Sequence, residues 1–334
     1  MTTQQAAPTA PPSTAPLSPE RAIWAGDSLR TTADAMEQVI HGKRRVVELV
    51  LATAVAGGHV LLEDVPGTGK TALARTLAQV MQGSASRIQF TPDLLPGDVT
   101  GITVYDQRQG VFEFHAGPIF ANVVLADEIN RASPKTQSAL LEVMEERQVT
   151  VDGETHPVGT PFMVIATQNP VEQAGTYRLP EAQLDRFAIK TSIGYPDATA
   201  MHRILQQQAS KPEIRPVMNT GTLLQLQEFA DQVFVNPLIA DYITRLVEAT
   251  RSAAEVRLGA SVRGALALQR MAVSWALLQG RAYVVPDDVR DLAISVLAHR
   301  LVLEPEAEFD GVTAEQVIGR ILLDVPQPQE NGAA

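Results

Sequence analysis

The amino-acid sequence predicts an α/β domain with a parallel sheet, followed by a smaller, all-helical domain. Up to residue 195, short apolar runs alternate with stretches of helical spacing, a pattern typical of parallel strands joined by right-handed crossovers. From residue 196 to about residue 323, only helical spacing is present. A third observation is a glycine-rich turn between the first apolar run and the next helix, which is typical of nucleotide-binding α/β proteins.

The composition narrows the class of protein. The chain has 334 residues and no cysteine, which excludes disulfides, thiolate metal sites and cysteine nucleophiles. Its formal net charge of −11 argues against strong non-specific binding to nucleic acid. The uncharged run at residues 49–62 is too short to span a bilayer, and the N-terminus lacks the features of a signal peptide. We therefore expect a cytoplasmic protein with no membrane span.

The change in pattern along the chain predicts four segments. Residues 1–20 are rich in Pro, Ala and Thr and are expected to form a disordered tail. Residues 21–195 would form the α/β domain and residues 196–325 the helical domain. Residues 326–334 would then be a flexible tail.

Two helices are expected before the first strand. One ends near Ile40, the second spans residues 44–56, and Gly42 separates them. The apolar residues 59–62 then predict a short buried strand, and residues 72–78 have the spacing of a helix.

Between that strand and that helix lies a phosphate-binding motif. Gly67 and Gly69 let the backbone approach phosphate oxygens, and the helix N-terminus behind them favours an anion. Lys70 would reach the β- and γ-phosphates, and the Thr71 hydroxyl would be a ligand of Mg²⁺. Asp64 stands where the general motif has its first glycine, and because Asp tolerates unusual dihedral angles better than most residues, this position is compatible with the loop.

The rest of the chain is predicted from periodicity and turn residues. Strands are expected at residues 87–90, 123–126, 162–167 and 188–193, and hairpins at residues 102–114 and 148–158. A helix is expected from Pro134 to about Arg147 with Ser133 as its N-cap, and residues 91–101 are expected to be a loop. The helical domain would contain helices at residues 197–209, 220–232, 237–252, 261–279, 286–299 and 313–323.

Polar side chains follow two of the buried strands. Asp127 and Glu128 end one strand, at the sheet edge where ligands of parallel sheets bind. Asp127 would hold Mg²⁺, and Glu128 would polarise the attacking water. Asn169 ends the next strand, where a neutral amide can hold that water beside the γ-phosphate.

Two arginines are candidates for stabilising phosphate charge. Arg186 could act on a neighbouring subunit, the alternative being a local surface pair with Asp185. Arg263 lies in the first turn of a helix that begins after Ser261, where a cation opposes the helix dipole unless a phosphate is near.

Taken together, these motifs resemble a AAA+ ATPase of the clade with an insertion in helix 2, and more narrowly the MoxR family. The runs at residues 61–71, 127–132, 166–170 and 179–187 carry the resemblance, which covers about residues 27–323. It implies an AAA+ P-loop nucleotide-binding domain followed by a small all-helical lid domain.

The resemblance also implies roles for individual residues. Lys70 and Thr71 would belong to Walker A, Asp127 and Glu128 to Walker B, Asn169 would be sensor 1, Arg186 the arginine finger and Arg263 sensor 2. The nucleotide, ATP with Mg²⁺, would lie on Pro66, Gly67, Thr68, Gly69, Lys70 and Thr71, with its adenine near Val39, Ile40 and Gly42.

The family's known members imply an ATP-driven, chaperone-like complex, expected to be a hexameric ring. Its usual partners carry von Willebrand factor A domains, and it assists the maturation of client proteins or the insertion of their metal cofactors. Three alternatives remain open: a helicase-like nucleic-acid motor, a magnesium-chelatase-type ATPase subunit, and a nucleotide-gated binding module that hydrolyses poorly. The first would need basic hairpin tips, but one tip contains only Arg108 and the other is Asp152-Gly153-Glu154.

Overall fold

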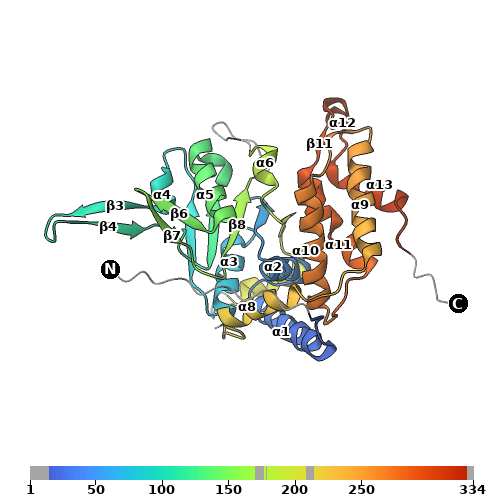
Figure 1. The fold of residues 1–334 in the computed structure, drawn as a ribbon, viewed down its shortest axis with the longest axis horizontal. Helices are drawn as coiled ribbons and strands as arrows, with labels where there is room; N and C mark the ends of the chain where they lie inside the picture. The colour runs from blue at the N-terminus through green and yellow to red at the C-terminus, as the bar shows by residue number, and fades with distance from the viewer. Residues whose placement is uncertain (1–14, 170–176, 178, 208–213, 329–334) are drawn as a thin grey trace.

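A computed structural model describes residues 15–169, 177, 179–207 and 214–328. The α/β part, the projecting hairpins and the helical part are seen side by side in Figure 1. Among the helices of these residues, none combines the length and the apolar character that a membrane crossing requires.

Five parallel strands form the central sheet. They are β1 (Val60–Glu63), β2 (Ala85–Gln89), β5 (Val123–Asp127), β8 (Met163–Gln168) and β9 (Ile189–Thr191), in the order β2-β5-β8-β1-β9. All five residues of β5 are buried, as expected of a strand covered on both faces. The predicted parallel sheet is therefore confirmed, and β8 lies between the strand of the phosphate loop and that of the acidic pair.

Helices cover both faces of this sheet. On one side lie α1 (Pro19–Glu37), α2 (Arg44–Val55) and α3 (Lys70–Val80); on the other lie α4 (Pro96–Thr100) and α5 (Pro134–Glu146). Consecutive residues of β1 point to opposite faces, so Val60 and Leu62 join the first apolar core while Leu61 joins the second.

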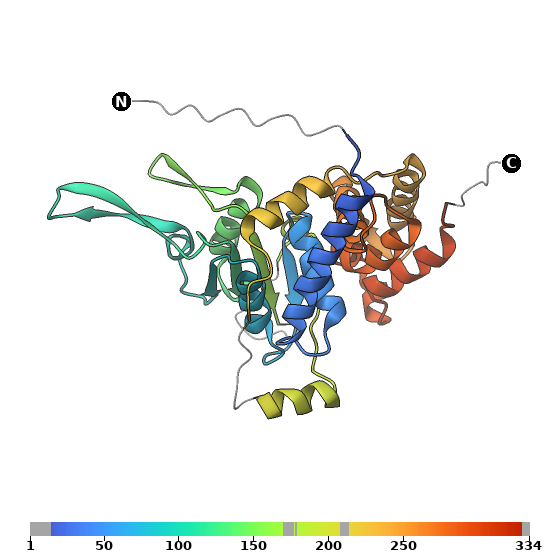
Figure 2. The ribbon, with the colours of Figure 1, turned by 90° about the horizontal axis from the view of Figure 1, so that it is seen from below.

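Two β-hairpins project from the α/β part. One pairs β3 (Gly101–Asp106) with β4 (Val111–Ala116), and the other pairs β6 (Gln148–Val151) with β7 (Glu154–Pro157). Figure 2 shows both hairpins extending from the same end of the molecule. Exposed apolar side chains lie next to the turn of the first hairpin, where 74% of Phe112 and 50% of Tyr105 are exposed.

The C-terminal part is mainly helical, as expected. Its helices are α7 (Ala198–Gln207), α8 (Thr220–Ala230), α9 (Pro237–Ser252), α10 (Val262–Leu278), α11 (Pro286–Leu297), α12 (Pro305–Phe309) and α13 (Ala314–Asp324). Helix α8 packs against α1 and α2 as well as α10, whereas α7 stands away from the body in Figure 2.

Some short elements differ from the prediction. The expected loop at residues 91–101 contains the one-turn helix α4, and the helical domain carries a small antiparallel pair, β10 (Val256–Leu258) with β11 (Val302–Leu303). These elements, with α6 (Glu181–Leu184), are too short to show a periodic apolar pattern, so tertiary contacts decide their conformation.

Candidate active site

The phosphate loop lies between β1 and α3. Gly67 and Gly69 have φ angles of +87° and +98°, which favour glycine, and a Cβ added to either would meet no atom within 4 Å. The space in front of the loop is therefore open. Gly69 is the N-cap of α3, so the backbone N–H groups of the first helical turn face this space without helical partners.

The side chain of Lys70 folds back onto the phosphate loop. Its Nζ donates hydrogen bonds to the backbone carbonyls of Asp64, at 3.0 Å, and Val65, at 3.3 Å. Backbone carbonyls are weak competitors for an ammonium group compared with a phosphate oxygen. Lys70 is thus held beside the loop in a position from which an anion can attract it.

Asp64 needs no unusual backbone conformation in the loop. It is absent from the non-glycine residues with positive φ, and it is buried. Its carboxylate accepts hydrogen bonds from the backbone N–H groups of Ile193, at 2.6 Å, and Gly194, at 2.9 Å. The residue therefore replaces the first glycine of the motif because of its side chain, which ties the loop to the segment that leads into α7.

The expected adenine region lies beside the same segment. Ile40 is buried, and Gly42 has a φ of +70°. A Cβ at Gly42 would lie 3.5 Å from the Cβ of Ala200 and 3.6 Å from Oδ2 of Asp197. The fold thus places residues 39–42, the phosphate loop and the start of α7 next to one another.

Both oxygens of Asp127 are engaged. Oδ1 accepts a hydrogen bond from the Thr167 hydroxyl at 2.7 Å, and Oδ2 accepts one from Arg87 at 2.6 Å. The Thr167 hydroxyl also accepts a hydrogen bond from the backbone N–H of Glu128 at 2.9 Å. Buried Thr167 therefore fixes the two carboxylate residues relative to β8.

Glu128 has a strained backbone. Its φ of +57° and ψ of +48° lie in the left-handed region, which costs a non-glycine residue about 1–3 kcal/mol. Its carboxylate accepts a hydrogen bond from Arg131 at 2.9 Å, and its side chain is 29% exposed. Strain of this kind persists only where the surrounding structure holds the residue in place.

The sheet order brings Asn169 to the same edge. Gln168 is in register with Glu63, the last residue of β1, and Asn169 follows directly. The register of β5 with β8 places Ala126 opposite Ala166. Asn169 thus ends the strand that separates the acidic pair from the phosphate loop, as the sequence predicts for sensor 1.

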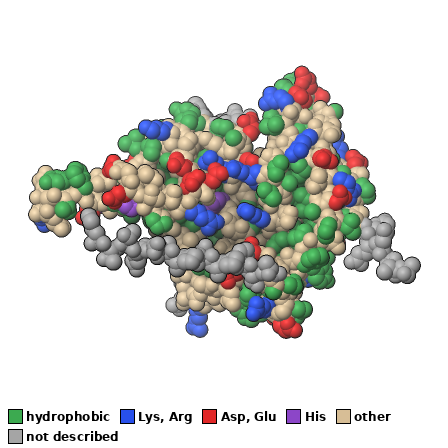
Figure 3. Space-filling model, viewed as in Figure 1, with side chains coloured by type: hydrophobic (Ala, Val, Ile, Leu, Met, Phe, Trp, Pro, Cys, Tyr) green, Lys and Arg blue, Asp and Glu red, His purple; other side chains and the backbone are tan. Residues whose placement is uncertain are grey.

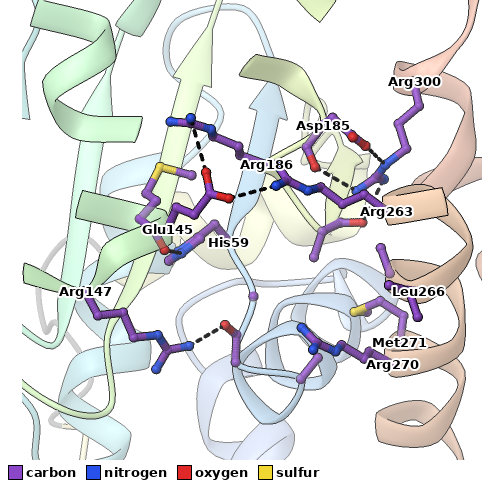
Figure 4. A pocket seen from close by; sticks show the side chains of 16 residues that line it. His59, Glu145, Arg147, Asp185, Arg186, Arg263, Leu266, Arg270, Met271 and Arg300 are labelled. Atoms are coloured by element: carbon purple, nitrogen blue, oxygen red, sulfur yellow. Dashed lines mark hydrogen bonds and ion pairs between the residues drawn. The ribbon is translucent and has the colours of Figure 1, made fainter. Parts of the chain in front are cut away.

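Arg186 and Arg263 lie at the other end of β1. Arg186 precedes β9, whose Ile189 is in register with Val60 at the start of β1, whereas Lys70 follows the far end of β1. Arg263 lies in the first turn of α10, and Ser261 caps that helix as predicted. Figure 4 shows both arginines reaching Glu145 on α5, with nitrogen–oxygen distances of 3.2 Å and 2.7 Å.

The local pair of Arg186 with Asp185, which the sequence left open, does not form. Asp185 instead accepts hydrogen bonds from the Ser261 hydroxyl, at 3.0 Å, and from Arg300, at 2.7 Å. Arg300 is buried and also donates to the carbonyl of Phe187 at 2.8 Å. The segment that carries Arg186 is thus fastened to the helical part.

Sequence reasoning missed several residues of the site. A polar residue within the apolar run of β8 is a signal that could have found Thr167, since buried hydroxyls need partners. Arg87 and Glu145 carry no such signal, because their partners lie on other elements and are brought near only by the fold.

The residues at the phosphate-loop edge fit a magnesium nucleotide. The open glycine turn and the N-terminus of α3 suit a phosphate group. Thr71 and Asp127 offer the hard oxygen ligands that Mg²⁺ prefers. Among the described residues, no group of three or more His, Cys, Asp or Glu side chains forms a metal site of its own.

The chain matches two family models and is similar to several known proteins. Residues 59–189 match the ATPase family associated with various cellular activities, and residues 248–321 match the AAA lid domain. The chain is 48% identical to the uncharacterised protein YeaC of Bacillus subtilis, over 91% of this chain and 96% of that protein. It is 45% identical to chaperone MoxR1 of Mycobacterium tuberculosis, over 89% and 81%, and 31% identical to protein MoxR of Paracoccus denitrificans, over 84% and 90%.

A solved structure has the same fold. It is that of a candidate ATPase from Cytophaga hutchinsonii, with a TM-score of 0.87 and 38% sequence identity, covering 93% of this chain and 98% of that one. Family models match both the α/β part and the helical part, and relatives at up to 48% identity extend over nearly their whole length. The chain is therefore a MoxR-family AAA+ ATPase.

Proposed function

We propose that this ATPase hydrolyses ATP at sites shared between neighbouring subunits of a ring, and that hydrolysis drives the remodelling of protein clients. The observation that carries the proposal is the position of Arg186 and Arg263 at the opposite end of β1 from Lys70. A head-to-tail ring presents one end of each subunit to the other end of the next. Six subunits would follow the family pattern.

Within one subunit, the phosphate-loop edge would bind the nucleotide. The backbone N–H groups of residues 67–71 and the Lys70 ammonium would hold the phosphates. Thr71 and Asp127 would hold Mg²⁺, which neutralises charge on the phosphate oxygens when bound. Residues 39–42 would pack against the adenine, since they adjoin both the loop and the start of α7.

Glu128 and Asn169 would act on the attacking water. The Glu128 carboxylate would accept its proton once it leaves Arg131, and the Asn169 amide would orient it without adding charge. Arg186 and Arg263 of the adjacent subunit would then stabilise the charge that develops on the transferred phosphoryl group.

The client is proposed to be a protein rather than a nucleic acid. Next to the turn of the β3–β4 hairpin, Phe112 and Tyr105 are exposed and their ring centroids lie 5.1 Å apart, while Arg108 is the only basic residue of the turn, residues 106–110. Exposed apolar side chains beside the turn suit contact with a protein surface, whereas a nucleic-acid motor grips phosphates with basic groups. The 45% identity to a protein named a chaperone supports the same choice. A von Willebrand factor A domain partner and a cytoplasmic location stay predictions.

The test separates nucleotide binding from turnover. Lys70→Ala should weaken ATP binding, because it removes the cation that meets the phosphates. Glu128→Gln should bind ATP normally and fail to hydrolyse it, because the amide cannot accept the proton. Equilibrium binding of a fluorescent ATP analogue and steady-state phosphate release measure the two effects. Near-normal phosphate release by Glu128→Gln would refute the assignment of the base.

A further inference from the structure

Glu145 holds two arginines that come from different parts of the chain. Its carboxylate lies between the guanidinium groups of Arg186, at 3.2 Å, and Arg263, at 2.7 Å (Figure 4). Arg186 belongs to the α/β part and Arg263 to the helical part. One carboxylate thus sets the positions of both cations.

Most of the charged side chains around Glu145 are positively charged. The cavity beside it has a volume of about 430 Å³, and five arginines line it: Arg147, Arg186, Arg263, Arg270 and Arg300. Among the residues that the structure describes, Glu145 and Asp185 are the only acidic ones that line it. Figure 3 shows basic side chains gathered over this region between the α/β and helical parts. Without Glu145, the guanidinium groups of Arg186 and Arg263 would repel each other with nothing between them.

The position of Glu145 on α5 does not stabilise its negative charge. It lies in the last turn of α5, where the helix dipole disfavours a negative charge, and Glu146 follows it. Glu146 makes no ion pair among the residues that the structure describes. The ion pairs with Arg186 and Arg263 therefore offset the unfavourable position of Glu145 at the end of α5. This indicates that Glu145 serves the two arginines rather than the stability of the helix.

The backbone that carries the arginines is fastened separately. Asp185 accepts hydrogen bonds from Arg300 and from the Ser261 hydroxyl, which tie the segment before β9 to the start of α10. Glu145 is thus needed only to aim the two side-chain ends. The Nε of Arg186 is buried and has no hydrogen-bond partner, so this guanidinium is not fully hydrogen-bonded within the subunit.

We propose that Glu145 is a positioning residue of the arginine half of the active site, holding Arg186 and Arg263 so that both meet one phosphate group of the neighbouring subunit. The inference rests on the proposed shared site. Each guanidinium keeps free N–H groups while it contacts Glu145, so the carboxylate stays in place when the phosphate arrives. Glu145 itself does not touch the nucleotide.

The test replaces the charge and keeps the shape. Glu145→Gln should lower the kcat of ATP hydrolysis by about 10- to 100-fold, the range expected when reacting groups lose their alignment. The KM for ATP should stay within about twofold, because the nucleotide is held by the phosphate loop of the other subunit. Glu146→Gln, one residue away on the same helix, is the matched control and should leave kcat unchanged. Ring assembly and thermal unfolding of both variants would be measured alongside.

A double-mutant cycle with Arg186→Lys distinguishes positioning from a general structural role. Lysine keeps the charge but lacks the planar fork that Glu145 aims. Adding Glu145→Gln to Arg186→Lys should therefore lower kcat by clearly less than it does in the unmodified chain. Equal effects in both backgrounds, or a Glu145→Gln variant with the kcat of Glu146→Gln, would overturn the inference. If Arg186→Lys itself retains full turnover, the shared-site proposal fails instead.

Discussion

Asp64 links the phosphate loop to the segment before α7 through two backbone N–H groups. Asp64→Ala should lower the free energy of unfolding by about 1–3 kcal/mol, because it leaves the buried N–H of Ile193 and the partly buried N–H of Gly194 unpaired. Asp64→Asn should not restore the loss fully, since one face of an amide is a donor. Urea denaturation measures the change, and ATP affinity should fall with it. A loss below about 0.5 kcal/mol, the range of ordinary surface substitutions, would contradict this role.

The buried imidazole of His59 predicts a pH dependence of stability. Its Nδ1 accepts a hydrogen bond from the N–H of Val164, and its Nε2 lies 3.1 Å from the carbonyl of Met144. Burial lowers the pKa of His59 from 6.5 to about 4, and burial likewise lowers the pKa of His299.

Because the folded pKa lies below the unfolded one, the unfolded chain binds the proton first as the pH falls. Stability is therefore fully present above pH 6.5 and is lost between about pH 6.5 and pH 4, by about 3 kcal/mol for His59. His59→Gln should be less stable at pH 7.5 and should show a smaller decline on acidification. Denaturation curves at pH 7.5, 6.5 and 5.5 provide the measurement, and equal slopes for the two proteins would refute the assignment.

At the scale of elements, the base of the β3–β4 hairpin depends on Gly101. Its φ is +97°, and a Cβ there would lie 2.4 Å from the carbonyl oxygen of His115. Gly153, in the turn of the other hairpin, has a φ of +83° and no atom within 4 Å of such a Cβ. An Ala substitution at Gly101 would therefore combine a steric clash with backbone strain, whereas one at Gly153 would cause backbone strain alone.

Gly101→Ala should destabilise the hairpin by more than about 2 kcal/mol, because the clash adds to the left-handed penalty of roughly 1–2 kcal/mol. Gly153→Ala should be destabilised by the backbone penalty alone, without a clash. Limited proteolysis reports the local opening of each hairpin, and thermal unfolding reports the whole domain. Similar proteolysis rates for the two variants would show that the base of the first hairpin can relax.

How well an element could be predicted depended on its length and burial. Strands such as β5 and β8 were predicted because each begins with four consecutive apolar residues, and α5 because Ser133 and Pro134 mark its start. The pair β10–β11 was missed because it contains only three and two residues. Its conformation comes from pairing across 44 residues of chain, from Leu258 to Val302, which no local pattern reveals.

For the whole molecule, the residue types of the site and the action of Arg186 on a neighbouring subunit could be predicted, but the end of the sheet at which Arg263 lies could not. Glycine, lysine and paired acids have a spacing dictated by phosphate chemistry. Which end of the sheet Arg263 occupies depends on how α10 packs, and that follows from contacts of Asp185 and Glu145 with the helical part. The conformation of Asp64 escaped prediction for the same reason, because its partners lie about 130 residues away.

Mixing two inactive variants tests the shared site directly. Arg186→Ala should lose about 10³–10⁵ in turnover, or roughly 4–7 kcal/mol of transition-state stabilisation, while binding ATP. In a ring mixed equally with Lys70→Ala, about a quarter of the interfaces combine an intact loop with an intact arginine. Phosphate release should therefore reappear on mixing. If Arg186→Ala forms rings and keeps most of its turnover alone, the assignment of this arginine is wrong.

The separation of Lys70 and Arg186 by the length of β1 has a consequence for dilute protein. A subunit whose own arginines face away from its own nucleotide can hold ATP without consuming it. The ATPase activity per subunit should then rise with protein concentration until assembly is complete. Newly made subunits would keep bound ATP without hydrolysing it until they assemble. Association with another subunit, rather than the binding of ATP, would start hydrolysis.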